Sequence, residues 1–531
     1  MNEKKRLEGL LEKGKITRRE FIVSMAAMGF SITAAGSMAR KVQAVVPKKG
    51  GFLKIGTSDG STSDTLNPAT LVAQMPSQIS FGQLRDALTV WGADGSAVPE
   101  LAESWDVTPD AKKWTFKLRK GVEFHNGKPM DVEDVIYSLN YHREEKNKSV
   151  IHALFKPVTD VRADGKHAVV ITLDSGNVFF PWVLGSSRAQ IFPKGSTAAD
   201  FDKGIGTGPY ILEDWEPGVR ALVKRNPNYW KESGPNFDAV ETLVINDTNS
   251  RTNALKTGQI HIMNHADLKT AHLLEKLPNI HLITASGGTN VDMPMRCDTP
   301  PFNDPNIRLA IKYSIDRDDM RKQIFHGYAE LGNDHCVHSA SIYHNNDLSQ
   351  RQYDPEKARF YLKKAGLSNL KVKLHASDAA FAGAMDAAIL SEEYAKKSGI
   401  EIEVVQTPAD GYWSHTWTKK PWCMSYWGGR PTPDAIYSVR FTSDAPYNDC
   451  YWYHDRFDEL VVMARKELDE DKRIEMYAET QEILNMEGGP VIPLFMYQVD
   501  AASTKIKTPE LVGGQFALDY FRAARRWWFK S

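Results

Sequence analysis

The chain has 531 residues and a mass of 59.6 kDa, too long for one compact core and long enough for two or three lobes. Charged residues make up 25% and hydrophobic residues 42%, which is the balance of an ordinary soluble globular protein. Disordered, collagen-like, coiled-coil and integral membrane proteins are therefore excluded. With 66 basic and 67 acidic side chains the net charge is −1, so no overall basic field indicates a nucleic acid partner.

The N-terminal segment contains the parts of an export signal in their usual order. The stretch TRREFI at 17–22 is typical of a twin-arginine signal, and a 14-residue run without charge extends from Ile22 to Ala35. Small residues then offer two cleavage positions, after Ala39 or after Ala44. The prediction is a twin-arginine signal peptide over residues 1–44, export by the twin-arginine translocase and a soluble mature chain. An amphipathic N-terminal helix that contains Arg-Arg is the alternative.

Four cysteines bear on the location of the protein: Cys297, Cys336, Cys423 and Cys450. A lipid-anchored export protein needs a cysteine at its new N-terminus, and none lies near the cleavage positions, so no lipid anchor is expected. A soluble exported protein stays with the cell where an outer membrane retains it, which favours the periplasm. Four thiols allow one or two disulfides, whose pairing the sequence leaves open.

Hydrophobic periodicity in the mature chain predicts an α/β organisation. Strands are expected at 51–56, 114–118, 168–173, 371–374 and 401–405. Helices are expected at 131–139, 305–314, 354–365 and 379–397. The first helix begins at the acidic Asp131, and the third ends at Gly366. The order of strand 371–374, helix 379–397 and strand 401–405 predicts a right-handed crossover in a mostly parallel sheet.

A set of short segments follows a fixed order along the mature chain. They are LAESW at 101–105, WTFKLR at 114–119, GVEFHNG at 121–127, GTGPY at 206–210, NPNYW at 226–230, PFND at 301–304 and IDR at 315–317. This ordered set resembles the family 5 solute-binding proteins, which include the dipeptide, oligopeptide and nickel receptors of ABC transporters. The resemblance extends from about residue 50 to residue 520.

The resemblance implies a fold class and a set of partners. The fold is an α/β, two-lobed periplasmic-binding-protein fold (type II, cluster C-like) with an extra inserted subdomain. Lobe I would comprise 45–85, 206–294 and 494–531, subdomain II would comprise 86–205, and lobe III would comprise 295–493. The lobes would close on a solute about hinge segments. The implied partners are an ABC permease and its ATPase at the inner membrane, and the receptor itself is expected to be a monomer.

The stretch 422–434, WCMSYWGGRPTPD, is the strongest candidate for ligand contact. It follows a predicted strand and combines aromatic, guanidinium and carboxylate groups with turn-forming residues. Its candidate residues are Tyr426, Trp427, Arg430 and Asp434. In peptide-binding members of the family, the matching loop carries an Asp that pairs with the peptide's amine. The closest match here is Gly429, followed by Arg430. A guanidinium favours a carboxylate, a phosphate or sugar hydroxyls over an ammonium group, so Arg430 either faces the ligand or pairs with Asp434.

Further candidates come from other segments. Trp413 and Trp417 could form another wall of the cleft, although a buried helix face is the preferred interpretation for Trp417. Asn290 and Asp292 follow the hinge-like pair Gly287-Gly288. Ser58 and Asp59 end the first predicted strand, where open α/β sheets bind their ligands.

The only metal-like cluster contains His335, Cys336, His338 and His344. A receptor for nickel or a metal chelate would use imidazoles near the cleft. The irregular spacing favours a surface loop instead, so no metal or other cofactor is expected.

The sequence lacks the motifs of a serine nucleophile elbow, a zinc protease, a phosphate-binding loop and a dinucleotide site, so no enzyme activity is expected. The prediction is a periplasmic receptor of an ABC importer that captures a peptide or a peptide-like, amphoteric compound between its lobes. The alternatives are a metal or metal-chelate receptor of the nickel type and a sugar or opine receptor on the same fold. A periplasmic chaperone or sensor without a transport role is the alternative from another class.

Overall fold

The structure is a computed structural model that describes Phe21, Ser24, Met25 and residues 47–530. The predicted export signal, apart from those three residues, and both predicted cleavage positions lie outside the described residues. Among the helices of this described part, none has the length and apolar character needed to cross a membrane.

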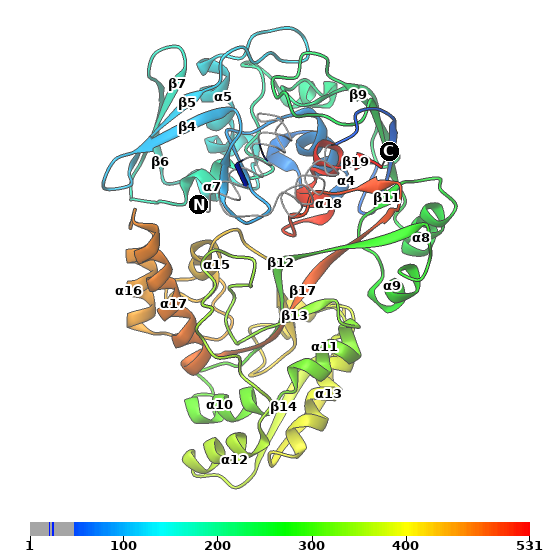
Figure 1. The fold of residues 1–531 in the computed structure, drawn as a ribbon. Coiled ribbons are helices and arrows are strands. Elements are labelled where there is room, and N and C mark those ends of the chain that lie inside the picture. Colours follow the sequence, from blue (N-terminus) through cyan, green and yellow to red (C-terminus); the bar gives the residue numbers. More distant parts are fainter. Residues whose placement is uncertain (1–20, 22–23, 26–46, 531) are drawn as a thin grey trace.

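A nine-stranded sheet extends through the molecule (Figure 1). Its order is β16-β12-β17-β11-β1-β10-β9-β8, and β13 pairs with β17 outside this path. The strands are β1 (Phe52–Thr57), β8 (Tyr210–Glu216), β9 (Arg220–Arg225), β10 (Ala239–Val244), β11 (Ile262–Met263), β12 (Ile280–Pro294), β13 (Ala329–Leu331), β16 (Ser425–Trp427) and β17 (Pro490–Ser503). Strand β1 is parallel to β10 and β11, and the other pairs of this sheet are antiparallel.

A second, four-stranded sheet of order β4-β5-β7-β6 lies at the upper left of Figure 1. Its part of the chain contains β2 (Thr89–Trp91), β3 (Ala97–Pro99), β4 (Ala102–Val107), β5 (Lys113–Leu118), α5 (Val132–Arg143), α6 (His152–Phe155), β6 (Val158–Ala163), β7 (Ala168–Leu173) and α7 (Phe180–Leu184). The predicted start of α5 is confirmed, because Asp131 accepts hydrogen bonds from the backbone N–H groups of Glu133 and Asp134. The four-stranded sheet and the strands β11, β1, β10, β9 and β8 of the nine-stranded sheet form what we call the upper body.

The upper body also contains short helices and the C-terminal strands. These are α4 (Gln74–Ile79), α8 (Thr248–Lys256), α9 (Leu268–Leu274), β18 (Ile506–Lys507), α18 (Ala517–Tyr520), α19 (Ala523–Arg526) and β19 (Trp528–Phe529).

What we call the lower body contains most of the longer helices. They are α10 (Pro305–Tyr313), α11 (Arg317–Phe325), α12 (Pro355–Lys364), α13 (Ala384–Lys396), α14 (Tyr412–His415), α15 (Pro433–Arg440), α16 (Asp455–Ala464) and α17 (Glu470–Glu487). They accompany β13, β16, β14 (Leu370–Ala376) and β15 (Ile400–Gln406). The predicted parallel pairing of β14 with β15 around α13 is confirmed. The prediction of a mostly parallel sheet is wrong for the nine-stranded sheet. Its consecutive strands β8 and β9 are joined by a short turn, which only antiparallel pairing allows.

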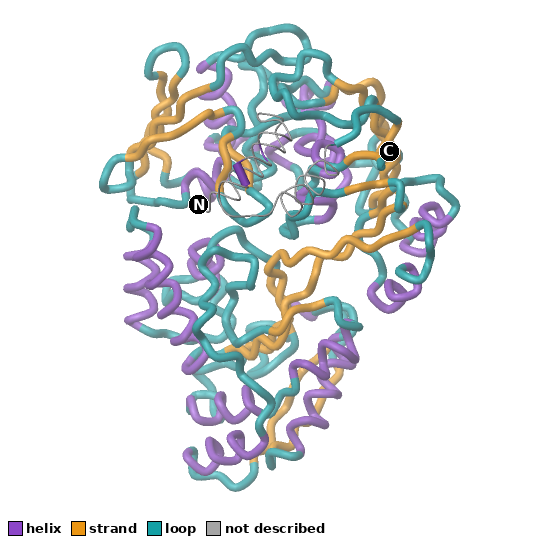
Figure 2. The backbone as a smooth tube through the Cα atoms, viewed as in Figure 1, coloured by secondary structure: helices purple, strands orange, loops and turns teal. Residues whose placement is uncertain are grey.

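Strands β12 and β17 join the two bodies and pass side by side between them (Figure 2). Their antiparallel register is regular from Ile280 to Ser286, is interrupted, and resumes at Asn290. The interruption contains Gly287 and Gly288, and Gly288 has a φ of +76° that L side chains rarely adopt. The connection is therefore narrow, and its register is irregular both here and between Val291 and Met293, which suits a hinge.

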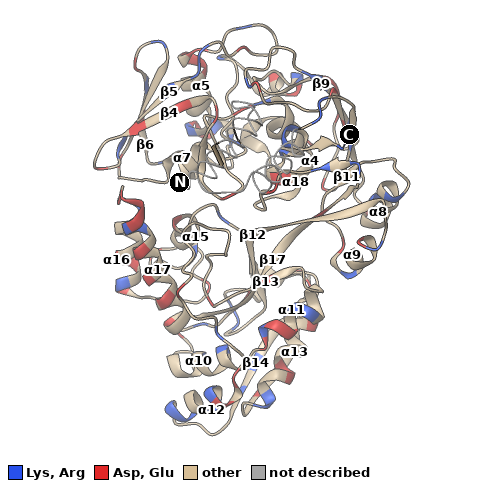
Figure 3. Cartoon of the chain, viewed as in Figure 1, with Lys and Arg blue, Asp and Glu red and all other residues tan. Residues whose placement is uncertain are grey.

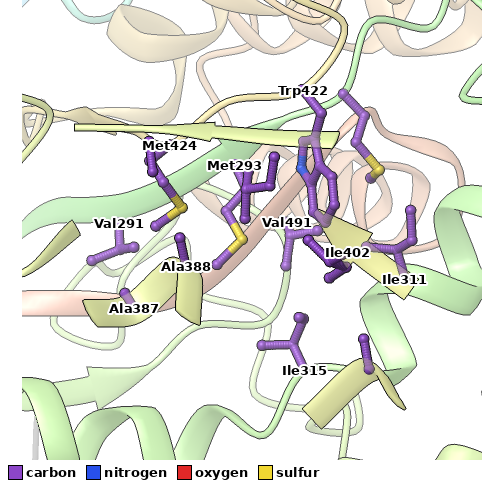
Figure 4. Packing of buried hydrophobic residues seen from close by; sticks show 14 of the residues in the cluster. Val291, Met293, Ile311, Ile315, Ala387, Ala388, Ile402, Trp422, Met424 and Val491 are labelled. Carbon is purple, nitrogen blue, oxygen red and sulfur yellow. The ribbon is translucent and has the colours of Figure 1, made fainter. Parts of the chain in front are cut away.

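Strand β12 ends, and strand β17 begins, in the core of the lower body. Figure 4 shows Val291 and Met293 of β12 and Val491 of β17 packed with Trp422 and other buried side chains. The hinge strands are thus anchored by hydrophobic burial on the lower side. Acidic and basic side chains are intermixed over both bodies in the view of Figure 3, in keeping with the net charge of −1.

The core of the lower body gives a first prediction. Leu374 of β14 is fully buried in it, so Leu374→Ala should lower the free energy of unfolding by about 2–5 kcal/mol, through lost burial and a residual cavity. Urea unfolding followed by circular dichroism measures this change. Leu468→Ala, at an exposed position of the same body, should stay within about 0.5 kcal/mol of the wild type. Equal effects for both variants would contradict the assigned core.

Candidate ligand-binding site

Five aromatic side chains of the lower body form one group, which we call the aromatic wall: Trp413, Trp417, Tyr426, Trp427 and Tyr447. Neighbouring ring centroids in this group lie 5.7–6.5 Å apart. Three of the rings are substantially exposed, with Trp413 at 40%, Tyr426 at 43% and Tyr447 at 54%. Clustered exposed aromatic rings are typical of a surface that binds something.

The wall lies beside the hinge. Strand β16, which carries Tyr426 and Trp427, pairs with β12 so that Trp427 lies opposite Asn290. The sequence prediction assigned Trp413 to a different wall from Tyr426 and Trp427, whereas the structure places all three rings in one group. The prediction did not include Tyr447, which lies in a loop without a motif. Their contact with a ligand remains a prediction.

A buried carboxylate holds two indoles of the wall from behind. Both Trp417 and Trp427 donate their Nε1–H groups to Oδ2 of Asp449, at 3.2 and 2.9 Å. Oδ1 of Asp449 lies 3.1 Å from Nε of Arg440, which also pairs with Asp292. The side chains of this Asp292–Arg440–Asp449 network are fully buried. The network therefore ties the wall to strand β12.

The two candidates on β12 are buried. Asp292 faces Arg440, and Asn290 donates from Nδ2 to the carbonyl oxygen of Gly288 at 3.4 Å. Burial raises the pKa of Asp292 to about 8, although Arg440 lowers it, and the charge of Asp449 adds to the rise. The placement of Asp292 gives it a structural partner and does not favour the predicted ligand contact.

The structure decides between the two alternatives for Arg430 and Asp434. Asp434, in the first turn of α15, accepts a hydrogen bond from Nε of Arg465 at 2.8 Å. Burial raises the pKa of Asp434, and Arg465 opposes this rise. Arg430 is exposed and makes a long hydrogen bond of 3.5 Å to the carbonyl oxygen of Gly429. The alternative in which Arg430 pairs with Asp434 is therefore wrong, because the Asp434 carboxylate pairs with Arg465, which is distant in sequence.

Gly429 leaves no room for a side chain. A Cβ atom there would overlap the carbonyl oxygen of Gly287 in the hinge. The backbone N–H of Gly429 also donates to Oγ1 of Thr289 at 3.3 Å. An aspartate at this position, as the family resemblance would place it, cannot be accommodated with this backbone.

Ser58 and Asp59 lie at the carboxyl end of β1, as predicted, but their polar atoms are engaged within the upper body. Ser58 exchanges two hydrogen bonds with the Asn264 side chain, at 3.0 and 3.1 Å. Oδ2 of Asp59 accepts from the backbone N–H of Gln74 at 3.0 Å, at the start of α4.

The predicted surface loop is wrong for His335, Cys336 and His338, which are buried, whereas His344 is half-buried. The rings of His335 and His344 lie 5.7 Å apart, and burial lowers the pKa of His335 to about 3. His338 lies against Gly288, and burial lowers its pKa as well. Over the residues that the structure describes, no group of three or more His, Cys, Asp or Glu side chains could hold a metal ion. Cys336 and the other three cysteines are free thiols.

Comparison with known proteins settles the family. The family described as "Bacterial extracellular solute-binding proteins, family 5 Middle" matches residues 96–449. The chain belongs to family 5 of the extracellular solute-binding proteins. The resemblance seen in the sequence is thereby confirmed, and the family's members are binding proteins that lie outside the cytoplasm.

Named relatives of this family 5 protein cover most of its length. It is 25% identical over 435 residues to the glutathione-binding protein GsiB of Escherichia coli K12, covering 76% of this chain and 81% of the relative. It is 25% identical over 512 residues to di/tripeptide-binding protein 1 of Pseudomonas aeruginosa UCBPP-PA14, covering 90% of this chain and 94% of the relative.

Solved structures show the fold of this family 5 protein. The periplasmic binding protein DppA of Helicobacter pylori, in complex with the peptide STSA, matches with a TM-score of 0.70 and 23% identity over 92% of this chain and 100% of that one. AgaA of A. tumefaciens R10, in complex with agropinic acid, matches with a TM-score of 0.68 and 23% identity over 91% and 99%. The two-lobed fold predicted from the sequence is confirmed.

The glycine packing at the hinge gives a second prediction. Gly429→Ala should lower the free energy of unfolding by about 1–3 kcal/mol, because its Cβ must displace the Gly287 carbonyl. Gly428→Ala is the matched control, since the nearest atom to its Cβ would be Nη1 of Arg430 at 3.9 Å, and it should change stability by less than about 0.5 kcal/mol. Thermal unfolding of both variants measures the difference, and a neutral Gly429→Ala would refute the close packing.

The buried network gives a third prediction, on pH. Because Asp292 has a raised pKa in the folded state, the folded chain keeps a proton that the unfolded chain has lost between about pH 4 and pH 8. Its contribution to stability is therefore present at low pH and is lost as the pH rises through this window, by up to about 1.4 kcal/mol per pH unit.

Asp292→Asn cannot titrate, so it should flatten the decline of stability from pH 5 to pH 8. Urea midpoints at four pH values measure the slope. Asp164→Asn, in an exposed loop of the upper body, should keep the wild-type slope. An unchanged slope in Asp292→Asn would show that this carboxyl group is ionised throughout.

Proposed function

We propose that this protein is the exported receptor of an ABC importer for a small peptide-like solute. The observation that carries the proposal is the exposed aromatic wall placed directly beside the narrow link between two bodies. A ligand that covers these exposed aromatic rings removes apolar surface from water, which favours binding. A site at a hinge couples that covering to closure of the bodies.

Binding and closure would proceed in two steps. The solute first contacts the wall of the lower body, and rotation about β12 and β17 then brings the upper body onto it. Closure excludes water and adds contacts from the second body. A micromolar affinity corresponds to about −8 kcal/mol, which several aromatic contacts and one or two charge-assisted hydrogen bonds can supply. The closed form would be the one that the membrane permease recognises.

The relatives support a peptide-like solute. Glutathione and di- or tripeptides are the solutes in the names of two of them, and glutathione is itself a tripeptide. The complex of AgaA with agropinic acid supports an opine-like compound as the second candidate. The nickel-type alternative gains no support from the described histidines, because His335 and His338 are buried and belong to no group of three or more possible metal ligands in the described part of the chain.

The cellular setting belongs to the same proposal. A periplasmic location, a cleaved twin-arginine signal over 1–44, a monomeric state, and delivery to an ABC permease and its ATPase would complete the import route. The lobe boundaries at 85/86, 205/206, 294/295 and 493/494 remain predictions as well.

Native mass spectrometry of the chain purified from periplasm without refolding tests the proposal. A stoichiometric organic compound that is lost on denaturation would support it and identify the solute. A bound divalent metal would favour the nickel-type alternative. If the chain retains no small compound and also binds none in a thermal-shift panel of peptides, opines and sugars, the chaperone or sensor alternative would be favoured.

The aromatic wall gives a fourth prediction. Trp413→Ala should weaken binding of the compound found by native mass spectrometry at least tenfold, which is about 1.4 kcal/mol, because an exposed stacking surface is lost. Isothermal titration calorimetry measures the change. Tyr453→Ala removes a ring that is 61% exposed on the same body outside the wall, and it should leave the affinity unchanged. Equal effects of the two substitutions would remove the wall from the binding site.

A further inference from the structure

Two cysteines lie together at the lower end of the hinge strands. Cys297 comes shortly after the end of β12, and Cys450 lies in the loop between α15 and α16. The backbone N–H of Cys297 donates to the carbonyl oxygen of Cys450 at 2.7 Å. In paired strands, residues joined by such a bond have Cα atoms about 5.5 Å apart, which is within the span of about 4.4–6.8 Å that a disulfide bridges. The main chain therefore holds the two cysteines at a separation that suits a disulfide.

The two side chains also approach each other. Gly489, which directly precedes β17, would bring a Cβ atom to 2.5 Å from Cβ of Cys450 and to 2.9 Å from Sγ of Cys297. One point in space thus lies next to both cysteine side chains. Any larger residue at position 489 would intrude between them, whereas glycine lets them face each other directly.

The other two thiols have different neighbours. Sγ of Cys336 lies 3.5 Å from Nη1 of Arg440, in the buried network behind the aromatic wall. The main chain of Cys423 pairs with His375 of β14. Among the pairings that the sequence leaves open, these contacts favour Cys297 with Cys450.

The two thiols differ in exposure, which gives the pair an order of reaction. Cys297 is half-buried, whereas Cys450 is fully buried. Burial raises the pKa of both thiols. The positive charges of Arg308 and Lys312 oppose the rise at Cys297, and the negative charge of Asp449 adds to the rise at the other thiol. Because the thiolate is the attacking species, Cys297 is the group that an oxidant in solution meets first.

We propose that Cys297 and Cys450 form a disulfide in the exported chain. The proposal rests on the export that is part of the proposed function, because disulfides form and persist in oxidising compartments such as the bacterial periplasm. It does not depend on which solute the protein binds.

The bond forms by two exchange steps with an oxidant that carries a disulfide, such as a thiol oxidoreductase or oxidised glutathione. The Cys297 thiolate attacks one sulfur of that disulfide, and the oxidant's other sulfur leaves as a thiolate. The Cys450 thiolate then attacks the Cys297 sulfur of the mixed disulfide and releases the oxidant's second thiolate. The two cysteines lose two electrons and two protons, and the oxidant's disulfide is reduced to two thiols.

The disulfide would connect the aromatic wall to the hinge by a covalent bond. Asp449, which holds two indoles of the wall, directly precedes Cys450. Cys297 lies three residues beyond the end of β12. The bond would therefore act alongside the Asp292–Arg440–Asp449 network, which ties the same parts together without a covalent link.

Peptide mapping tests the pair in the full chain taken from the periplasm. Free thiols are alkylated at lysis without reductant, and the unfolded chain is digested with trypsin. Each cysteine falls in a separate tryptic peptide: 297–308, 323–351, 420–440 and 441–456. Mass spectrometry should find 297–308 linked to 441–456. Four alkylated cysteines, or a link from either peptide to one of the other two, would overturn the proposal.

Single substitutions check the assignment. Cys297→Ser and Cys450→Ser should each abolish the linked species and leave three cysteines that alkylate fully after unfolding. Cys423→Ser is the matched control, because it removes another buried thiol and should leave the link in place. Loss of the link in this control as well would show that the pairing is not specific and would contradict the proposal.

Reduction should destabilise only a chain that contains the bond. The disulfide closes the long loop between residues 297 and 450, so dithiothreitol should lower the thermal midpoint of the wild type by about 4 °C or more. Cys297→Ser lacks the bond and should have the same midpoint with and without the reductant. Equal shifts in the two chains would contradict a stabilising link between these residues.

The mass measurement separates the disulfide from the receptor function. A linked chain that neither retains nor binds a small compound would keep the disulfide and remove the receptor function. A chain that retains a compound but has four free thiols would keep the receptor function and remove the disulfide. A chain absent from the periplasmic fraction would remove the export on which both proposals rest.

Discussion

The buried guanidinium of Arg440 is the interaction on which the site depends. It lies between the carboxylates of Asp292 on the hinge strand and Asp449 behind the aromatic wall. Burial is the main reason that the pKa of Asp292 is raised, and the charge of Asp449 adds to the rise against the opposing effect of Arg440. Such a network contributes little net stability but fixes the relative position of its members. It sets the orientation of Trp417 and Trp427 relative to the hinge.

Close backbone packing is the second constraint, and it limits which side chains the hinge loop can carry. Where the family resemblance would place an amine-binding Asp, Gly429 lies against the Gly287 carbonyl with no space for a side chain. The residue that projects from the loop is the next one, Arg430, which is exposed. Substitution of an acid by a glycine and an exposed arginine reverses the charge offered to a ligand at this point.

More of the fold than of the candidate site could be predicted from the sequence. Local signals located α5 through its Asp131 cap, and periodicity located β14, α13 and β15, because these depend on neighbouring residues. The roles of Asp292 and Asp434 could not be read locally, since their arginine partners lie 148 and 31 residues away in the chain. Tyr447 of the aromatic wall lies in a loop without a motif, and only its ring contacts with Trp417 and Trp427 place it in the wall.

A balance of charges connects these observations. The acidic side chains that reach the hinge region are neutralised by buried arginines or cap a helix, and this requirement comes from the cost of an unpaired buried charge. Arg430 of the hinge loop has no Asp or Glu oxygen within 4.0 Å among residues 47–530, so its charge is unmatched there although the whole chain is nearly neutral. An unmatched cation beside the aromatic wall would favour a solute with an anionic group, because a charge pair is stronger where water is excluded.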